Sequence, residues 1–432
     1  MKRIILPLLF VLPLAACGAD EGTEADTSAT AEQSADADQG YETAGSDNYA
    51  DSMASDDRPY LSNGRNSAEM NSDAEGMSED DSSGNTETIA DSEERPTMQL
   101  QVVLDREGFG PGVIDGAMGM STRNALEGFQ EANGLEMTGE LNEETEEALS
   151  EWERVPATRV VTIPASWGDA EYVDIPEDTA AKAEMVRLGY KSLDERLAER
   201  FHTTVEVLRE LNPNGRPAGA VSPTGGETPE SSASASATPT PTPTGTATAS
   251  NSQGFFTAGQ QIRVPNIGAD RIAPGSVEDR SWQQTMASLG VGSEQPQVDR
   301  IVVSKSGSTL KAYQGDELVA LFTVSSGSSE FPLPLGEWDI VGEAYNPPYS
   351  YDPEVLGLEN SDEQEYTLPP GPNGPVGVVW IDLSKEHYGI HGTPDPETIG
   401  RAQSSGCVRL TNWDAARLSA MVDTETQVIF ES

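Results

Sequence analysis

Basic residues are scarce in this chain of 432 residues. It carries 26 Lys and Arg against 73 Asp and Glu, which gives a formal net charge of −47. A chain of this charge repels phosphate backbones and anionic surfaces, so we exclude nucleic acid as a partner. Hydrophobic residues are also few, at 36%, and this indicates that a good part of the chain stays outside any core. The length predicts about two to four domains.

Long hydrophobic runs are lacking as well. The apolar run at the N-terminus, from Ile4 to Leu14, is too short to span a bilayer as a stable helix. Because Lys2 and Arg3 precede it and small residues end it, we interpret residues 1–17 as an export signal. The signal closes on Leu14-Ala15-Ala16-Cys17, which resembles the lipobox of bacterial lipoproteins.

The lipobox resemblance implies that the signal is cut before Cys17 and that this cysteine carries lipid. Gly18 follows in place of Asp, which favours an outer-membrane anchor on the periplasmic side of the cell envelope. An ordinary signal peptide with a chance cysteine is the alternative. The only other cysteine is Cys407, so lipidation of Cys17 leaves the chain no second thiol for a disulfide. A thiol kept in an oxidising compartment calls for a chemical reason.

Residues 18–96 are predicted to be a disordered, acidic tether. From Asp20 to Glu94 there are 22 acidic residues and two basic ones, Arg58 and Arg65. Such a segment buries too little apolar surface to fold. A flexible chain of about 75 residues has an r.m.s. reach of roughly 50 Å, so the tether would let an anchored domain work at a distance from the membrane.

Residues 97–152 predict three short amphipathic helices separated by Gly-rich turns. The segment contains, in order, Leu-Asp-Arg-x-Gly-Phe, Ile-Asp-Gly-x-x-Gly, Thr-Arg-x-Ala-Leu-x-x-Phe-Gln and Thr-Gly-x-Leu. This order is similar to that of the small three-helix peptidoglycan-binding domain, and the resemblance implies binding to the cell wall. Taken singly, Asp115, Gly116, Thr122 and Arg123 are interpreted as residues that shape turns and caps.

Residues 186–268 resemble a LysM module that is split by a disordered Ser/Thr/Pro insertion at 216–254. Two predicted helices lead to Asn212-Pro213, and Gly-x-x-Ile-x-Val-Pro resumes the pattern at Gly259. The opening strand of the module is poorly matched. Residues 153–185 are strand-like between Val160 and Ile175 and form a connector of unknown role. His202 is interpreted as a capping or packing residue.

Residues 299–432, which follow a linker at 269–298, are β-rich by pattern. A Ser306-Gly307 turn separates two alternating runs and predicts a hairpin. Further strand-like runs extend to Leu383, and one helix follows near the C-terminus, for which Thr411 is a plausible N-cap. We therefore expect a multidomain chain: a small three-helix bundle, a LysM-like α/β module and a mainly-β, sandwich-like C-terminal domain.

The chemically informative residues lie in this C-terminal domain. Acyl transfer through cysteine needs a thiolate, a proton acceptor and donors for the oxyanion. The domain holds Cys407, with His391 and His387 just upstream, and Gly406 leaves backbone N–H groups open beside the thiol. An imidazole beside a thiol lowers the pKa of that thiol toward working pH. Spacing alone does not show that the two groups meet.

His-Gly-Thr at 391–393, followed after ten residues by Ser-x-Gly-Cys-Val-Arg-Leu-x-Asn, is similar to the signature of the L,D-transpeptidase catalytic domain. Pro334-Leu335-Gly336-Glu337-Trp338 also resembles that family. The resemblance implies that Cys407 is the nucleophile and His391 the proton acceptor and donor. It implies that supporting roles for the substrate or the oxyanion fall to Gly392, Thr393, Ser404, Ser405, Gly406 and Arg409.

The same resemblance implies the reaction. The terminal D-Ala of a tetrapeptide stem would leave, a thioester would form on Cys407, and an amine of a neighbouring stem would complete a 3→3 cross-link in peptidoglycan. No metal or organic cofactor is implied. Where this chain has Ser405, family members usually carry His, and its loss could weaken thiolate stabilisation or change the preferred acceptor. His387 is interpreted as a surface or packing residue.

Three alternatives stay open beside this cross-linking enzyme. One is a lipid-anchored tether that binds the wall without turnover. In the second the acceptor is water, which gives an L,D-carboxypeptidase, and in the third it is a protein lysine, which gives lipoprotein attachment. Acceptor choice depends on loop shape beyond the motif. The sequence leaves the oligomeric state open.

Overall fold

The computed structural model describes residues 89–220, 254–268, 270–329, 331–353, 364–401 and 406–432. The export signal, Cys17, most of the acidic tether and most of the Ser/Thr/Pro insertion lie outside the described residues, as do Ser404 and Ser405. Among the described residues no helix is both long and apolar enough to cross a membrane.

The first folded segment contains the three helices that amphipathic spacing predicts. They are α2 (Pro96–Arg106), α3 (Met120–Ala132) and α4 (Glu143–Ala148), with a short 3-10 turn, η1, at Ser150–Trp152. Asn142 caps α4, because its side chain accepts a hydrogen bond from the backbone of Thr145. The helices share a buried cluster that includes Leu104, Leu126 and Phe129. These helices form together because each buries one apolar face against the others.

The second segment forms a β–α–α–β unit. The strand β2 (Thr158–Thr162) pairs antiparallel with β3 (Gln261–Pro265), and α6 (Leu193–Arg200) and α7 (Val205–Leu211) lie between them in the chain. Its minor elements are η2 (Ala165–Gly168), α5 (Thr179–Ala183) and η3 (Pro213–Gly215).

This arrangement differs from the expectation at one point. Residues 153–185 were predicted to be a connector outside the module, yet β2 lies in that range and closes the small sheet with β3. Ile163 and Trp167 also share a core with Leu197, Leu208 and Ile262. The pairing joins strands about a hundred residues apart, which local periodicity does not reveal.

The third segment is dominated by a ten-stranded sheet in the order β1-β6-β5-β4-β14-β8-β11-β12-β13-β7. The predicted hairpin is confirmed, because β4 and β5 pair antiparallel. Strand bounds are β1 Phe109–Gly110, β4 Arg300–Ser304, β5 Thr309–Gln314, β6 Glu317–Thr323, β7 Ser325–Ser326, β8 Gly336–Tyr345, β11 Val379–Leu383, β12 Gly389–His391, β13 Val408–Arg409 and β14 Gln427–Glu431. A separate two-stranded sheet pairs β9 (Tyr349–Tyr351) with β10 (Tyr366–Leu368).

The large sheet is strongly curled. Only Val324 separates β6 from β7, although these strands lie near opposite ends of the sheet order. The two ends must therefore come together around a common core, which is the mainly-β architecture that the alternating pattern predicted. The helices α8 (Arg280–Leu289) and α9 (Asn412–Ser419) pack on this core, and Thr411 caps α9 as predicted. A 3-10 turn, η4, spans Pro396–Thr398.

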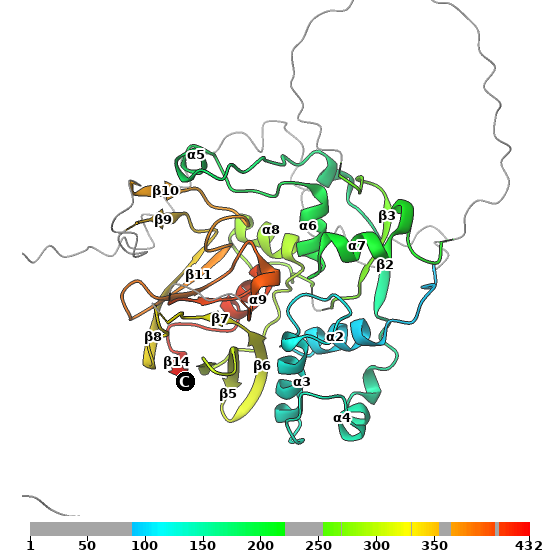
Figure 1. Cartoon of the computed structure of the whole chain (residues 1–432), viewed down its shortest axis with the longest axis horizontal. Coiled ribbons are helices and arrows are strands. Elements are labelled where there is room, and N and C mark those ends of the chain that lie inside the picture. The colour runs from blue at the N-terminus through cyan, green and yellow to red at the C-terminus, as the bar shows by residue number, and fades with distance from the viewer. Residues whose placement is uncertain (1–88, 221–253, 269, 330, 354–363, 402–405) are drawn as a thin grey trace, which may run out of the picture. The chain divides into compact units, whose positions relative to one another are not determined.

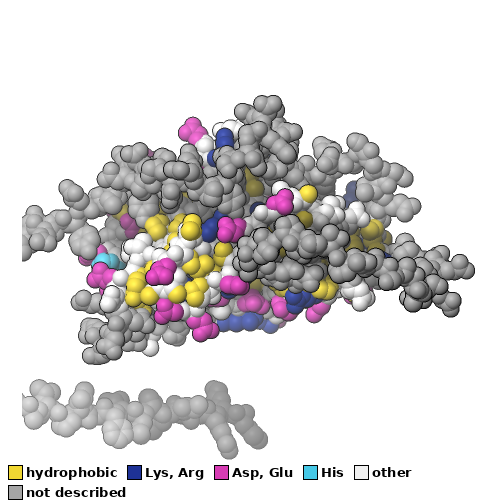
Figure 2. All heavy atoms as spheres, turned by 90° about the horizontal axis from the view of Figure 1, so that it is seen from above, with side chains coloured by type: hydrophobic (Ala, Val, Ile, Leu, Met, Phe, Trp, Pro, Cys, Tyr) yellow, Lys and Arg dark blue, Asp and Glu magenta, His cyan; other side chains and the backbone are white. Residues whose placement is uncertain are grey.

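The three segments contact one another directly. β1, from the helical segment, pairs in parallel with β6 of the large sheet, and α6 lies beside α8 (Figure 1). On the face shown in Figure 2, hydrophobic side chains gather in the left half with acidic side chains scattered among and around them.

A buried ionic cluster lies where the segments meet. Asp105 of α2 accepts hydrogen bonds from Arg417 of α9 (3.2 Å) and from the imidazole of His202 (3.4 Å). The other ring nitrogen of His202 donates to the carbonyl of Leu289 (2.9 Å), and the ring stacks on Trp413 (4.9 Å between centroids). Burial by itself would raise the pKa of Asp105, but the charges of Arg417 and His202 hold it well below its usual value. His202 is therefore a packing residue of the junction, in line with its predicted role.

Candidate functional site

Strand register brings His391 and Cys407 to one face of the sheet. β12 and β13 are parallel neighbours, with Ile390 opposite Val408 and His391 opposite Arg409. Ile390 and Val408 are fully buried in the core. Because side chains alternate along a strand, His391, Arg409 and Cys407, which directly precedes β13, project to the opposite face. Cys407 thus lies two residues before Arg409, the strand partner of His391.

The thiol of Cys407 is half-buried beside the end of β12. Its Sγ donates a weak hydrogen bond to the carbonyl of His387 (3.6 Å). Burial raises the pKa of the Cys407 thiol, while the backbone of Gly389 and the charge of Arg409 act in the opposite direction. The neutral thiol is accordingly the resting form at neutral pH.

The backbone before Cys407 requires glycine. Gly406 has φ +104°, a region that residues with a side chain rarely adopt. A Cβ at this position would also lie 2.7 Å from the ring of Tyr388. Gly406 therefore lets the chain pass close under Tyr388 and turn the thiol toward the site.

The imidazole of His391 is buried, with 6% of its surface exposed, and its tautomer is defined. Nδ1 lies 2.7 Å from the carbonyl of Gly392, which can only accept, so Nδ1 carries the proton and Nε2 is the available base. The ring stacks on Trp380 of β11 (5.5 Å between centroids, 21° between planes). Burial lowers the pKa of His391 to about 4; the bond to Gly392 opposes this shift and the charge of Arg409 adds to it. The ring is therefore neutral at physiological pH.

The remaining predicted residues surround this pair. Arg409 is half-buried, and burial lowers its pKa while Asp395 and Cys407 act to raise it. Thr393 is buried, and its hydroxyl accepts a hydrogen bond from the backbone of Asp395 (3.3 Å). Gly392 lies in close contact with the side-chain oxygen of Asn412. His387 is exposed and contributes only its carbonyl to the thiol.

Sequence reasoning missed several residues of the site. Trp380 faces His391 across β11 and β12, and its partner position could have been found only from the strand register. Burial raises the pKa of Tyr349 of β9, and Cys407 and Asp352 act in the same direction. Asn412 is the last residue of the Ser-x-Gly-Cys-Val-Arg-Leu-x-Asn motif, but the sequence does not predict its contact with Gly392.

No group of three or more His, Cys, Asp or Glu side chains within the described ranges is placed to hold a metal ion. The site itself brings together a neutral thiol, a neutral imidazole whose Nδ1 carries the proton and a nearby guanidinium. Such a set can transfer an acyl group through sulfur, because the imidazole can take the thiol proton as sulfur attacks.

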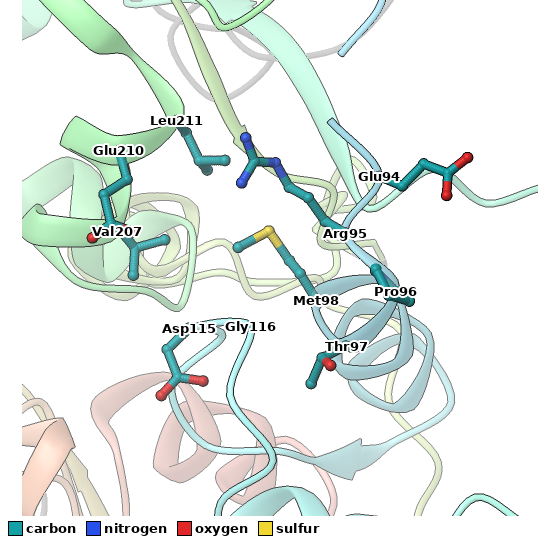
Figure 3. A pocket seen from close by; sticks show the side chains of 10 residues that line it. All are labelled: Glu94, Arg95, Pro96, Thr97, Met98, Asp115, Gly116, Val207, Glu210 and Leu211. Carbon is teal, nitrogen blue, oxygen red and sulfur yellow. The ribbon is translucent and has the colours of Figure 1, made fainter. Parts of the chain in front are cut away.

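A second region of interest is a cavity of about 270 Å³ between α2 and α7, shown in Figure 3. Met98 projects into it toward Val207, and the two side chains also share one core cluster. Arg95 extends along its upper wall, and Asp115 and Gly116, from the Ile-Asp-Gly motif, form the opposite wall.

Comparison with known protein families identifies two segments. Residues 298–430 match the model described as "L,D-transpeptidase catalytic domain", and residues 95–149 match "Putative peptidoglycan binding domain". Among curated proteins, "Putative L,D-transpeptidase YkuD" of Bacillus licheniformis is 36% identical over 129 residues, which are 30% of this chain and 63% of the relative. The protein of the same description from Bacillus subtilis is 31% identical over 128 residues, again 30% and 63%. The chain thus spans less than two thirds of these relatives.

Solved structures also match in part. An L,D-transpeptidase from Mycobacterium smegmatis is 22% identical with a TM-score of 0.26, over 31% of this chain and 58% of that one. L,D-transpeptidase 3 from Mycobacterium tuberculosis is 19% identical with a TM-score of 0.26, over 32% and 61%. The sequence matches thus show similarity to the L,D-transpeptidase catalytic domain at residues 298–430, after a segment at residues 95–149 that is similar to the family described as "Putative peptidoglycan binding domain".

Proposed function

We propose that this protein is an L,D-transpeptidase that forms 3→3 cross-links in peptidoglycan, with Cys407 as nucleophile and His391 as base. The proposal is supported by the register of β12 and β13, which sets His391 opposite Arg409, two residues after Cys407, and by the bond from Nδ1 to Gly392, which leaves Nε2 of His391 as the base. The family matches at 298–430 and 95–149 support the same chemistry and the same polymer.

The reaction follows from the resting protonation states. Burial disfavours both the thiolate and the imidazolium, so the pair rests neutral and the proton moves only during attack. Sγ of Cys407 attacks the carbonyl of the third stem residue as Nε2 of His391 takes the thiol proton. The C–N bond to D-Ala then breaks, and the imidazolium returns that proton to the leaving nitrogen. A thioester remains on Cys407.

The second half-reaction reverses these proton movements. An amine from a neighbouring stem attacks the thioester, and Nε2 of His391 takes a proton from it. The C–S bond breaks, the sulfur recovers a proton from the imidazolium, and a new amide joins the two stems. Backbone N–H groups around Gly406 stabilise the oxyanion in both steps. Arg409 and Thr393 support the substrate, and the carbonyl of Gly392 holds the imidazole in place.

The N-terminal segments hold the enzyme to its polymer. In this proposal the domain at 95–149 binds peptidoglycan, and the unit formed by β2, α6, α7 and β3 is a LysM-like module that binds its glycan. The β–α–α–β order and the shared core of that unit support the assignment. A lipid on Cys17, in the part of the chain outside the described residues, would anchor the protein in the outer membrane. Labelling with radioactive palmitate, compared between the full chain and Cys17→Ala, tests that anchor.

Incubation with muropeptides tests the activity. The full chain is mixed with disaccharide tetrapeptides, and the products are identified by mass spectrometry. Cross-linked dimers support transpeptidation, tripeptides alone indicate an L,D-carboxypeptidase, and intact substrate indicates a binding protein. Cys407→Ala should give no product yet still sediment with purified sacculi, which separates catalysis from wall binding.

A further inference from the structure

The catalytic domain is braced by residues that lie outside it. The backbone N–H of Leu188 donates to the carbonyl of Pro370 (2.9 Å), and the N–H of Asn373 donates back to the carbonyl of Leu188 (3.0 Å). The side chain of Asn373 also donates to Gly189 (2.9 Å). The segment that leads into α6 is therefore hydrogen-bonded to the loop that precedes β11.

One side chain continues this contact to the active site. Asn412, at the start of α9, is fully buried. Its Nδ2 donates to Oε1 of Glu199 on α6 (2.7 Å) and to the carbonyl of Pro372 (3.1 Å). Its Oδ1 lies against Gly392 and Gly377 so closely that neither position has room for a Cβ. The side-chain amide of Asn412 thus packs directly against the backbone of Gly392.

Gly392 in turn controls the imidazole. Its carbonyl is the acceptor for Nδ1 of His391 (2.7 Å), and this bond leaves Nε2 as the base. A displaced carbonyl would free the ring to rotate or to adopt the other tautomer, in which Nε2 carries the proton and cannot accept one. The chain of contacts is therefore Glu199, Asn412, Gly392, His391.

We propose that Glu199 is a positioning residue for the active site, supplied by α6 from outside the catalytic domain, and that it acts by fixing Asn412 against Gly392. The inference rests on the proposed function of His391 as the base. It makes the β–α–α–β unit a structural part of the active site as well as a wall-binding module. None of the family matches includes this helix, because they cover residues 95–149 and 298–430.

The surroundings of Glu199 are consistent with a side chain that accepts the hydrogen bond from Asn412 permanently. Burial raises the pKa of Glu199 to about 7, while hydrogen bonds from Tyr190 and Asn412 act in the opposite direction and the charge of Glu195 raises it further. A cavity of about 200 Å³ lies beside it, between α6 and the loops around Asn373 and Pro394. Glu199 keeps its bond from Asn412 in either protonation state, because Oε1 remains an acceptor.

The test compares two substitutions of nearly equal size in the full chain. Glu199→Gln keeps an acceptor for Asn412, whereas Glu199→Met fills the space and removes it. The readout is the rate of alkylation of Cys407 by iodoacetamide, located by peptide mass spectrometry, together with kcat and KM for muropeptide turnover. The matched control is Glu206→Ala, because Glu206 lines the same cavity on α7 and is exposed.

Glu199→Met should slow alkylation of Cys407 at pH 7 about tenfold, which is the worth of one hydrogen bond to a charged group. kcat should fall with KM little changed, and Glu199→Gln and Glu206→Ala should react like the unchanged chain. The proposal is overturned if Glu199→Met and Glu206→Ala are alkylated at equal rates. It is also overturned if the fall in alkylation rate in Glu199→Met only matches the fraction of unfolded protein measured by circular dichroism. Alkylation needs no peptidoglycan, so a chain that fails to cross-link muropeptides still tests the role of Glu199.

Discussion

Removal of Asp105 should destabilise the protein strongly, although it lies far in sequence from the catalytic residues. Asp105 is 2% exposed and faces Arg417, 4% exposed, and His202, fully buried. Asp105→Ala leaves the guanidinium of Arg417 buried without its carboxylate partner. Breaking one side of a buried pair costs about 3–5 kcal/mol, and for a domain of this size that lowers Tm by roughly 10 °C.

The pH dependence of this contribution has a definite sign. The folded-state pKa of Asp105 is held below its unfolded value of 3.8, so its stabilising contribution is present at neutral pH. That contribution declines as the pH falls below about 4, where the unfolded chain takes up the proton, and it is fully lost only when the pH falls through the lower folded-state pKa. The Tm difference between the unchanged chain and Asp105→Ala should therefore narrow in acid.

Thermal melting followed by circular dichroism measures both effects. Glu147→Ala, an exposed residue of α4, is the control and should leave Tm unchanged. Asp105→Leu combined with Arg417→Met should recover part of the loss, because the guanidinium of Arg417 is then no longer buried without a carboxylate. A Tm for Asp105→Ala within about 2 °C of the unchanged chain would refute the argument that this cluster holds the segments together.

Three further outcomes are expected. Because burial lowers the pKa of His391 to about 4, the rate of Cys407 alkylation should show no inflection near pH 6.5, and in acid it should fall as the imidazole is protonated near pH 4; an inflection at 6.5 that vanishes in His391→Ala would contradict this. Gly406→Ala should reduce turnover at least tenfold, since a residue at φ +104° is strained by about 1–3 kcal/mol; unchanged kcat would count against the argument. Trp380→Leu should lower kcat, because it removes the ring that stacks on the imidazole of His391; an unchanged kcat and an unchanged dependence of kcat on pH would show that this stacking has no role in catalysis.

Local chemistry made much of the architecture predictable. The three helices at 96–148 follow from amphipathic spacing between Gly-rich turns, and the hairpin of β4 and β5 follows from two alternating runs around Ser306-Gly307. Thr411 caps α9 because a short hydroxyl side chain before a helical run satisfies a backbone N–H group. Each of these signals lies within a few residues of the element that it specifies.

The rest depends on contacts between distant parts of the chain. The pairing of β2 with β3 joins Val160 to Arg263, and that of β1 with β6 joins Phe109 to Leu321. β1 has two residues and β2 has five, and an alternating pattern this short does not predict which strand each one pairs with. The same holds at the site. Cys407 and His391 were found by motif, whereas the bond from Asn412 to Glu199 joins residues 213 positions apart and leaves no local signal.

In the proposed mechanism, the thiol of Cys407 and the imidazole of His391 act as one nucleophile–base pair. Intact-protein mass spectrometry of the full chain, quenched in acid shortly after mixing with a disaccharide tetrapeptide, tests it most directly. We expect a transient adduct on Cys407 with the mass of the substrate less D-Ala. This adduct should be absent in Cys407→Ala and should form at least a hundredfold more slowly in His391→Ala. An adduct on another residue, or one that forms at the same rate without His391, would contradict it.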